Sequence, residues 1–362
     1  MKIENKLLLI RDNIKPTFKN WKVTGIFNPG AIRLPNKKIM LMARIAEKVK
    51  ERVNGPELSP IIISKKDYEV HYKKIFKKRI VMKKGEITYL KGGVVRLATM
   101  SHLRRVILSE DGFYIEEMEE KPTYVGVPGD GDFGVEDPRI VKIGNRYLMT
   151  YVSVCLHEGV CTSLAISHDG KHWDRKGIIF RQHNKDVVLF PDKINNRYVA
   201  LHRPEGTMDF SKKSIWIYYS KDLMYWGREK SILMSRSDSW GESWVGSGVP
   251  PIKISKGWLL IYHGVKAFGN YNVYSVGAAL LDLNNPERVL ARTPRTRPLI
   301  RPTEEYEKKG HISFVVFPTG AVPTTDGEHV LLYCGGSDSV ITVKKLSIKE
   351  VLESLEAVTE QI

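Results

Sequence analysis

EDPRIVKIGNRYLMTYVSV, residues 136–154, is the most informative stretch of this sequence, because its pattern returns along the chain. It consists of a proline-led strand, a tight polar turn and an apolar strand, which is typical of a β-hairpin. Four other stretches repeat it, at 28–45, 190–204, 249–265 and 317–336. Five copies of one hairpin predict a repeat architecture.

A second pattern accompanies the first: a strand that ends in Ser-x-Asp or a near relative, followed by an aromatic residue. It occurs at 61–72, 106–115, 164–173 and 217–226, and in weaker form at 277–290. The Asp-Gly or Asp-Leu step is typical of a turn between two alternating strands. Two hairpins supply the four strands of one propeller blade, so ten alternating hairpins predict an all-β, five-bladed β-propeller. A β-sandwich with coincidental turns is the less favoured alternative.

Only the C-terminal stretch has a helical pattern. Ser347 and Glu350 have capping-box spacing ahead of an amphipathic run. We expect a helix over 347–360, packed on the outside of the propeller. Because no linker rich in Pro, Gly or Ser divides the chain, we expect one domain over residues 1–362.

Composition narrows the class of protein. Hydrophobic residues make up 42% and charged residues 27% of the chain, and the net charge is +16. The lysines form short scattered clusters without nucleic-acid-binding motifs, so we expect a solvated surface and no nucleic-acid partner. The apolar run Leu7–Ile10 is too short for a signal peptide or a membrane span. With only three cysteines, these features predict a cytoplasmic protein without a membrane partner.

The proline-led hairpins carry polar residues that blade stability does not require, and equivalent ends of propeller blades converge on a central channel. These residues are Asn28, Arg44, Glu136, Asp137, His202, Arg203, Tyr262, His263 and Asp338. Any one of them could serve in a salt bridge between blades, but charges are costly to bury unless they are paired or bind something. No clustered His and Cys ligands indicate a metal site. A carboxylate beside a ring of cations suits a sugar substrate and an anionic nucleophile.

Several motifs together resemble glycoside hydrolase family 130, the mannoside phosphorylases, in order from about residue 20 to 350. They are GVEDPRI (135–141), SHLRRVILSEDG (101–112), VVLFPDKINNRYVALHRP (187–204), GWLLIYHGV (257–265) and YCGGSDSVI (333–341). The resemblance implies a five-bladed propeller and makes Asp137 the general acid of an inverting reaction. Phosphate would attack the anomeric carbon of a β-mannoside and release α-mannose 1-phosphate. The proton would pass from Asp137 through the mannosyl 3-hydroxyl.

The resemblance also implies two groups of ligand-binding residues. Phosphate would be held by Lys185, Arg203, His263 and a tyrosine, Tyr274 or Tyr271, and the sugar would meet Asn28, Arg44, Arg104 and Asp338. Inorganic phosphate would be a co-substrate, with no cofactor and no metal. Family members that hydrolyse their substrates carry glutamates where this chain has Lys185 and His263. Lys185 also replaces an arginine found in many relatives, and lysine binds phosphate as a point charge rather than a fork.

Two other functions stay open. An inverting β-mannosidase would use water, with Glu136, Asp186, Glu205 or Glu242 as the base; a non-catalytic glycan-binding propeller would use aromatic platforms such as Trp240 and Trp244. Overall likeness favours β-1,2-mannobiose or β-1,2-oligomannan over β-1,4-linked substrates. We expect loops around 47–60, 205–212 and 235–247 to set the choice of acceptor. A homo-oligomer also stays open.

Overall fold

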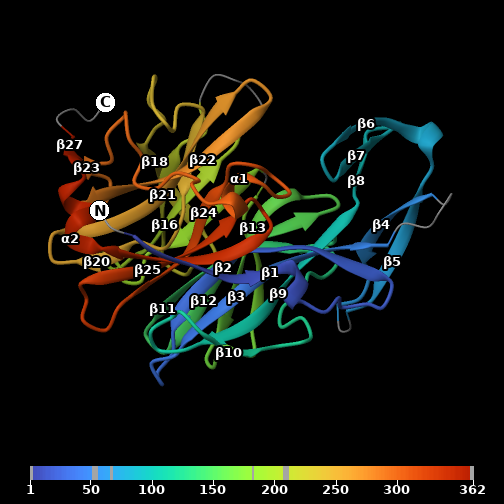
Figure 1. The fold of residues 1–362 in the computed structure, drawn as a ribbon, viewed down its shortest axis with the longest axis horizontal. Helices are drawn as coiled ribbons and strands as arrows, with labels where there is room; N and C mark the ends of the chain where they lie inside the picture. The colour runs from blue at the N-terminus through green and yellow to red at the C-terminus, as the bar shows by residue number, and fades with distance from the viewer. Residues whose placement is uncertain (1–2, 51–55, 66–67, 182, 207–211, 359–362) are drawn as a thin grey trace.

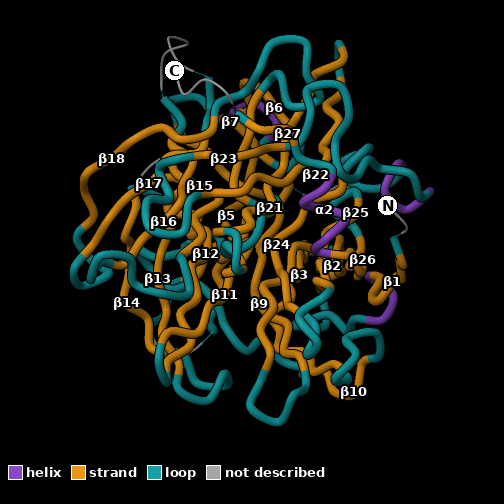
Figure 2. Tube along the Cα trace, turned by 90° about the vertical axis from the view of Figure 1, so that its left-hand side faces the viewer, coloured by secondary structure: helices purple, strands orange, loops and turns teal. Residues whose placement is uncertain are grey.

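The computed structural model describes residues 3–50, 56–65, 68–181, 183–206 and 212–358. Their regular secondary structure is almost entirely β-strand, as expected (Figures 1 and 2). The helices are short: α1 (Glu305–Lys308), α2 (Ile348–Glu353) and the 3-10 turns η1 (Arg11–Asn13) and η2 (Lys77–Arg79). In the described ranges, no helix is long and apolar enough to cross a membrane. The three cysteines are buried.

Five antiparallel sheets of four or more strands form the body of the molecule. The first contains β10 (Ile115–Met118), β9 (Thr99–Leu108), β3 (Ile39–Val49) and β2 (Trp21–Arg33). The second contains β11 (Val135–Ile143), β12 (Arg146–Cys155), β13 (Gly159–Ser167) and β14 (Asp174–Phe180). The third contains β15 (Asn184–Leu189), β16 (Tyr198–Pro204), β17 (Ile215–Ser220) and β18 (Trp226–Leu233).

The last two sheets complete the body. The fourth contains β19 (Trp244–Ser247), β20 (Ile252–Ile254), β21 (Gly257–Phe268), β22 (Tyr271–Leu281), β23 (Val289–Arg292) and β27 (Glu356–Ala357). The fifth contains β24 (Val316–Pro323), β25 (His329–Gly336), β26 (Val340–Ser347) and the N-terminal strand β1 (Glu4–Ile10). Strands from both ends of the chain therefore pair in one sheet.

The apolar core lies between successive sheets. Five clusters of buried side chains each join two consecutive sheets, and one of them, with Ile26 and Tyr333 among its members, joins the fifth sheet to the first. Along one edge of the sheets, β2 contacts β11, β11 contacts β15, β15 contacts β19, and β24 contacts β2. The sheets therefore follow one another in a cycle, with these strands facing its middle.

The turn chemistry explains both sequence patterns. In the Ser-x-Asp turns the aspartate accepts backbone N–H groups just after it, as Asp169 does from Lys171 at 2.8 Å and Asp222 from Met224 at 2.9 Å. The proline-led hairpins turn through residues of positive φ, including Gly144 at 61°. In the first of them this residue is Lys37 at 68°.

Strict alternation of the ten hairpins is wrong in two places. The hairpin at 61–72, of which residues 66–67 lie outside the described ranges, joins none of the five sheets. It forms a separate pair, β4 (Glu57–Ile62) with β5 (Val70–Ile75), next to a small sheet of β6 (Ile80–Lys84), β7 (Ile87–Leu90) and β8 (Val94–Leu97). This inserted unit, residues 56–98, projects from the body (Figure 1). In the fifth sheet, β1 supplies the fourth strand that no second hairpin provides.

The C-terminal helix is shorter than the expected 347–360. Ser347 accepts a hydrogen bond from the backbone N–H of Glu350 at 3.4 Å, at the predicted cap. The helix α2 ends at Glu353, and the chain then pairs with β23 through β27. Residues 359–360 of the predicted helix lie outside the described ranges.

Candidate active site

One backbone device, repeated in three sheets, positions the site. Asn28, Asp137 and Asp186 occupy equivalent places in β2, β11 and β15, where the pairing register shifts as in a β-bulge. Their φ angles are 48°, 47° and 57°. Asn and Asp are the residues besides glycine that adopt this left-handed conformation most readily. The repeated bulges turn three polar side chains toward the middle of the cycle of sheets.

A pocket of about 280 Å³ lies at this position. Eight of the nine residues predicted to act on substrates line it: Asn28, Arg44, Asp137, Lys185, Arg203, His263, Tyr274 and Asp338. The other lining residues are Asp186, Glu205, Lys213, Trp244, Ile312, Val315 and Phe317. The structure thus brings together side chains from all five sheets.

Arg104 is the predicted residue that does not line the pocket. It is 1% exposed, and its guanidinium donates to His102 Nε2 and Thr17 Oγ1, each at 3.0 Å, and lies 3.7 Å from Glu47. These contacts place it in a buried polar cluster beneath the inserted unit. The expectation that Arg104 faces the sugar is therefore not met by this placement.

Two other residues expected in the channel also face elsewhere. His202 stacks on Phe180 and Tyr218, and Tyr262 stacks on Trp240 in the core between sheets. Their neighbours Arg203 and His263 line the pocket, because successive side chains of a strand point to opposite faces. The proposed aromatic platform at Trp240 is wrong, since this side chain is only 8% exposed.

Asp137 is held by donors on one side of the pocket, which we call the sugar side. Its Oδ1 accepts hydrogen bonds from Asn28 and Arg44, each at 2.9 Å, and Arg44 also binds Glu136 at 2.7 Å. Burial raises the pKa of Asp137, but the charges of Arg44 and Arg139 and the Asn28 hydrogen bond outweigh it, so the pKa lies below its usual value. Asn28 Oδ1 is buried without a hydrogen-bond partner among the described residues, as a group awaiting a ligand would be.

Asp338 lies on the same side, in the turn that follows β25. Burial raises its pKa to about 6, with Asp137 and Glu136 adding to the rise against the opposing charges of Arg44 and His311. Two carboxylates that share one pocket thus have pKa values displaced in opposite directions. Such a divergence is typical of sites that move protons.

The opposite side of the pocket, which we call the anion side, is organised around Asp186. Its carboxylate accepts from Arg203 Nε at 2.6 Å and from Arg139 at 3.2 Å, and it lies 3.6 Å from His263 Nε2. Burial opposes ionisation of Asp186, but the charges of Arg203 and Arg139 hold its pKa far below the usual range. Burial also lowers the pKa of His263 to about 4, so this imidazole is neutral at pH 7.

The rest of the anion side carries more positive than negative charge. Glu205 pairs with Arg203 and, at 2.7 Å, with Lys213. Burial raises the pKa of Glu205, but these two cations outweigh burial and lower it to about 2. The ammonium group of Lys185 lines the pocket but forms no hydrogen bond or ion pair in the described part of the chain. Burial raises the pKa of Tyr274 to about 12, which keeps its hydroxyl a donor.

Sequence reasoning missed part of this arrangement. Arg139 lies within the EDPR motif, and its bonds to Asp186 and to the carbonyls of Asp137 and Gly248 tie three sheets together. Gly246 is required because a Cβ there would lie 2.4 Å from Asp186 Oδ2. The position of Arg139 beside Asp137 was a usable signal, whereas nothing in the sequence marked Gly246.

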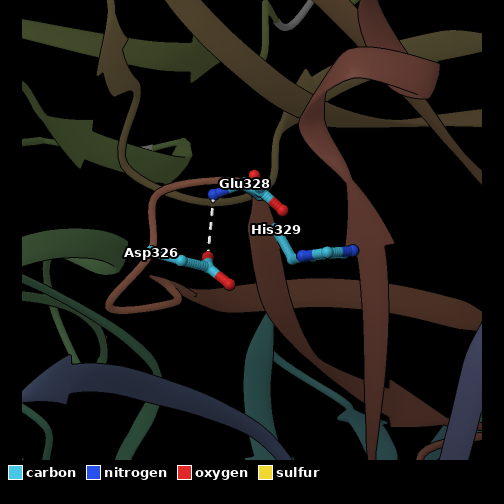
Figure 3. Close-up of side chains that lie close together, drawn as sticks. All are labelled: Asp326, Glu328 and His329. Carbon is cyan, nitrogen blue, oxygen red and sulfur yellow. Dashed lines mark hydrogen bonds between the residues drawn. The ribbon is translucent and has the colours of Figure 1, made fainter.

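One group of side chains in the described ranges has metal-ligand spacing, at the turn between β24 and β25. Figure 3 shows Asp326, Glu328 and His329 there. Asp326 already accepts from the backbone N–H of Glu328 at 2.9 Å and from Thr324 Oγ1 at 2.6 Å. The first two residues are exposed, and this turn lies at the end of β24 away from the pocket, so we assign it a structural role in the turn.

Comparison with known proteins agrees with this geometry. Residues 107–357 match the sequence profile of glycoside hydrolase family 130, described as β-1,4-mannooligosaccharide phosphorylase. The chain is 34% identical to the β-1,2-mannobiose phosphorylase of Listeria innocua over 98% of this chain and 97% of that protein. This chain belongs to glycoside hydrolase family 130.

Other relatives and a solved structure extend the likeness within family 130. The 1,2-β-oligomannan phosphorylase of Thermoanaerobacter is 39% identical over 67% of this chain and 78% of that protein. The β-1,4-mannooligosaccharide phosphorylase of Ruminococcus albus is 29% identical over 68% of this chain and 71% of that protein. The Listeria enzyme solved with β-1,2-mannobiose superposes with a TM-score of 0.87, at 33% identity and covering 98% of this chain and 99% of that one.

Proposed function

We propose that this protein cleaves β-mannosides by inverting phosphorolysis, releasing α-D-mannose 1-phosphate and a shortened sugar. The substrate class is β-1,2-mannobiose or β-1,2-oligomannan, since the relatives named for β-1,2 linkages are 34–40% identical and the β-1,4-mannooligosaccharide relative 29%. The whole chain would act as one catalytic domain. Its five sheets would be the five blades of a propeller, an interpretation supported by the cycle of inter-sheet cores.

The observation that carries this proposal is the pairing of the candidate carboxylate bases with cations, while the Lys185 ammonium group stays unpaired in the described part of the chain. An inverting hydrolase needs a second carboxylate that is free to activate water. The candidate bases are occupied: Asp186 and Glu205 are each bound by two cationic side chains, and Glu136 pairs with Arg44. Glu242 pairs with Lys266 and does not line the pocket. Lys185 instead offers an ammonium group that suits an anionic nucleophile.

The residues then divide into roles. Lys185, Arg203, His263 and Tyr274 would hold phosphate, and Asn28, Arg44 and Asp338 would hold the mannosyl unit whose bond breaks. Asp137 would supply the proton to the leaving oxygen, through the mannosyl 3-hydroxyl. Its lowered pKa means that the empty site holds it ionised at pH 7, so the proton must arrive with the substrates.

One assay tests the reaction class. The purified protein is incubated with β-1,2-mannobiose, and in parallel with β-1,4-mannobiose, with and without phosphate. We expect mannose 1-phosphate only when phosphate is present, and faster with the β-1,2 linkage. Free mannose in equal amounts with and without phosphate would establish hydrolysis instead. No cleavage of either sugar under any condition would favour a binding protein.

A further inference from the structure

The catalytic pocket is too small for an oligosaccharide. Its volume of about 280 Å³ lies just below the range for ligand pockets, roughly 300–1,000 Å³. A mannosyl unit and a phosphate would occupy it under the proposed function. Any further sugar units on the leaving side must therefore bind outside the pocket.

The arrangement of the pocket gives the direction in which they leave. In an inverting displacement the nucleophile enters opposite the leaving group. The proposed phosphate ligands Lys185, Arg203 and His263 belong to the third and fourth sheets. The leaving group accordingly points toward the first and fifth sheets, which contribute Arg44 and Asp338.

A second cavity, a groove of about 640 Å³, opens on that side. Ile312 and Asp338 line the pocket, while their chain neighbours His311 and Ser339 line the groove. These two segments are joined by a hydrogen bond from the backbone N–H of His311 to Ser339 Oγ, at 3.0 Å. The groove thus begins directly behind the two segments that contain Ile312 and Asp338.

The groove also lies at the same end of the sheets as the pocket mouth. Its floor includes Lys22 and Thr24 at the start of β2, next to the point where β3 leads into the inserted unit. Glu86, in the turn between β6 and β7, forms part of the far wall. The inserted unit, which projects from the body in Figure 1, therefore contributes to the wall of the groove.

The lining chemistry fits a neutral, hydroxyl-rich chain. The lining contains charged groups of both signs, such as Lys22, Lys309 and Glu86, and few apolar residues. Ionised side chains form stronger hydrogen bonds to hydroxyl groups than neutral ones do.

We propose that this groove binds the mannosyl units of the leaving chain, and that the protein therefore acts on β-mannan oligosaccharides of three or more units better than on the disaccharide. This inference rests on the proposed function and adds the part of the substrate that the catalytic pocket does not hold. Lys22 and Lys309 are specificity residues in this account, because they line the groove and not the pocket.

Chain-length kinetics test the proposal. kcat/KM for phosphorolysis is measured with β-1,2-mannobiose, -mannotriose and -mannotetraose, in the wild type and in a Lys22→Ala/Lys309→Ala variant. Lys349→Ala is the matched control: Lys349 and Lys309 are 84% and 81% exposed, and each faces a glutamate one helical turn away. All three proteins are compared by thermal melting.

We expect kcat/KM to rise from the disaccharide to the trisaccharide in the wild type. The double variant should lose about fivefold with the longer substrates, because exposed hydrogen bonds contribute modestly, and less with mannobiose, whose single leaving unit reaches only the start of the groove. The control should match the wild type. A wild type that prefers mannobiose, or an unchanged chain-length ratio in the double variant, would overturn the groove proposal alone. Absence of mannose 1-phosphate with every substrate would instead contradict the proposed function.

Discussion

The two sides of the pocket balance their charges in opposite ways. On the sugar side three carboxylates, Glu136, Asp137 and Asp338, surround a single guanidinium, Arg44. On the anion side the cations of Arg139, Arg203, Lys213 and Lys185 outnumber Asp186 and Glu205. An excess of carboxylates raises the pKa of one of them, here Asp338, and an excess of cations attracts an anion. The difference separates the handling of the proton from the binding of the nucleophile.

The largest effect should follow from changing the acid on the sugar side. Asp137→Asn keeps the shape, tolerates the positive φ and still accepts from Asn28 and Arg44, but it cannot donate the proton. We expect kcat to fall by about 10²–10⁴-fold with the fold intact, and the melting temperature to fall modestly because the buried ion pair with Arg44 is lost. Initial rates of mannose 1-phosphate formation measure this loss, with the surface variant Asp192→Asn as control. Retention of more than about a tenth of the activity would assign the acid to another group.

On the anion side, Arg203→Ala should raise the KM for phosphate by about tenfold to a hundredfold and the KM for the mannoside far less. It also leaves Asp186 and Glu205 each short of a partner, so the melting temperature should fall. Steady-state kinetics with each substrate varied in turn separates the two constants. Equal increases in both would place Arg203 in the sugar subsite.

Lys185→Ala tests the anion side with a smaller expected change in the KM for phosphate and without an effect on stability. Because its ammonium group forms no ion pair in the described ranges, its removal breaks no internal ion pair and takes away only its longer-range attraction to Asp137. The KM for phosphate should rise about tenfold without a change in melting temperature, and Lys185→Arg should restore most of the affinity. A lower melting temperature in Lys185→Ala would mean that this lysine serves the fold rather than phosphate.

The sequence predicted which segments line the pocket better than it predicted the face of the strand to which each side chain points. The proline-led hairpins brought Asn28, Asp137 and His263 into one place because the repeat fixes equivalent positions. His202 and Tyr262 were misplaced because the period of two along a strand sends them to the other face. Lys185 and Asp186 are neighbours that both line the pocket, which only a bulge with positive φ permits.

Residues outside the repeat were the hardest to place. Arg104 lies on β9, one strand farther from the centre than β3, and its partners Glu47 and Thr17 come from distant segments. No local pattern specifies such contacts. The inserted unit likewise departs from the hairpin order, and the groove beside it depends on how the unit packs against the start of β2. Parts of the acceptor loops predicted at 47–60 and 205–212 lie outside the described ranges.

The smallest effect concerns stability and returns to the sugar side. The pKa of Asp338 is raised to about 6, mainly by burial, from about 4 in an unfolded chain. The folded protein therefore binds this proton more tightly, so the stability that it contributes is complete below about pH 4 and is lost as the pH rises through 6. Asp338→Asn mimics the neutral carboxyl group at every pH and should not show this loss.

Without substrate, the Asp338→Asn variant should accordingly melt higher than the wild type at pH 8, by about 2–4 °C for a gain of about 1–2 kcal/mol. The difference should disappear near pH 4, where both proteins carry a neutral group. Matched melting curves at the two pH values measure it, and Asp326→Asn, in the exposed β24–β25 turn, is the control for an aspartate whose pKa is lowered. If the wild type is instead the more stable protein at pH 8, the positive charge of Arg44 compensates for the ionised carboxylate of Asp338. The excess of carboxylates on the sugar side then does not raise the pKa of Asp338.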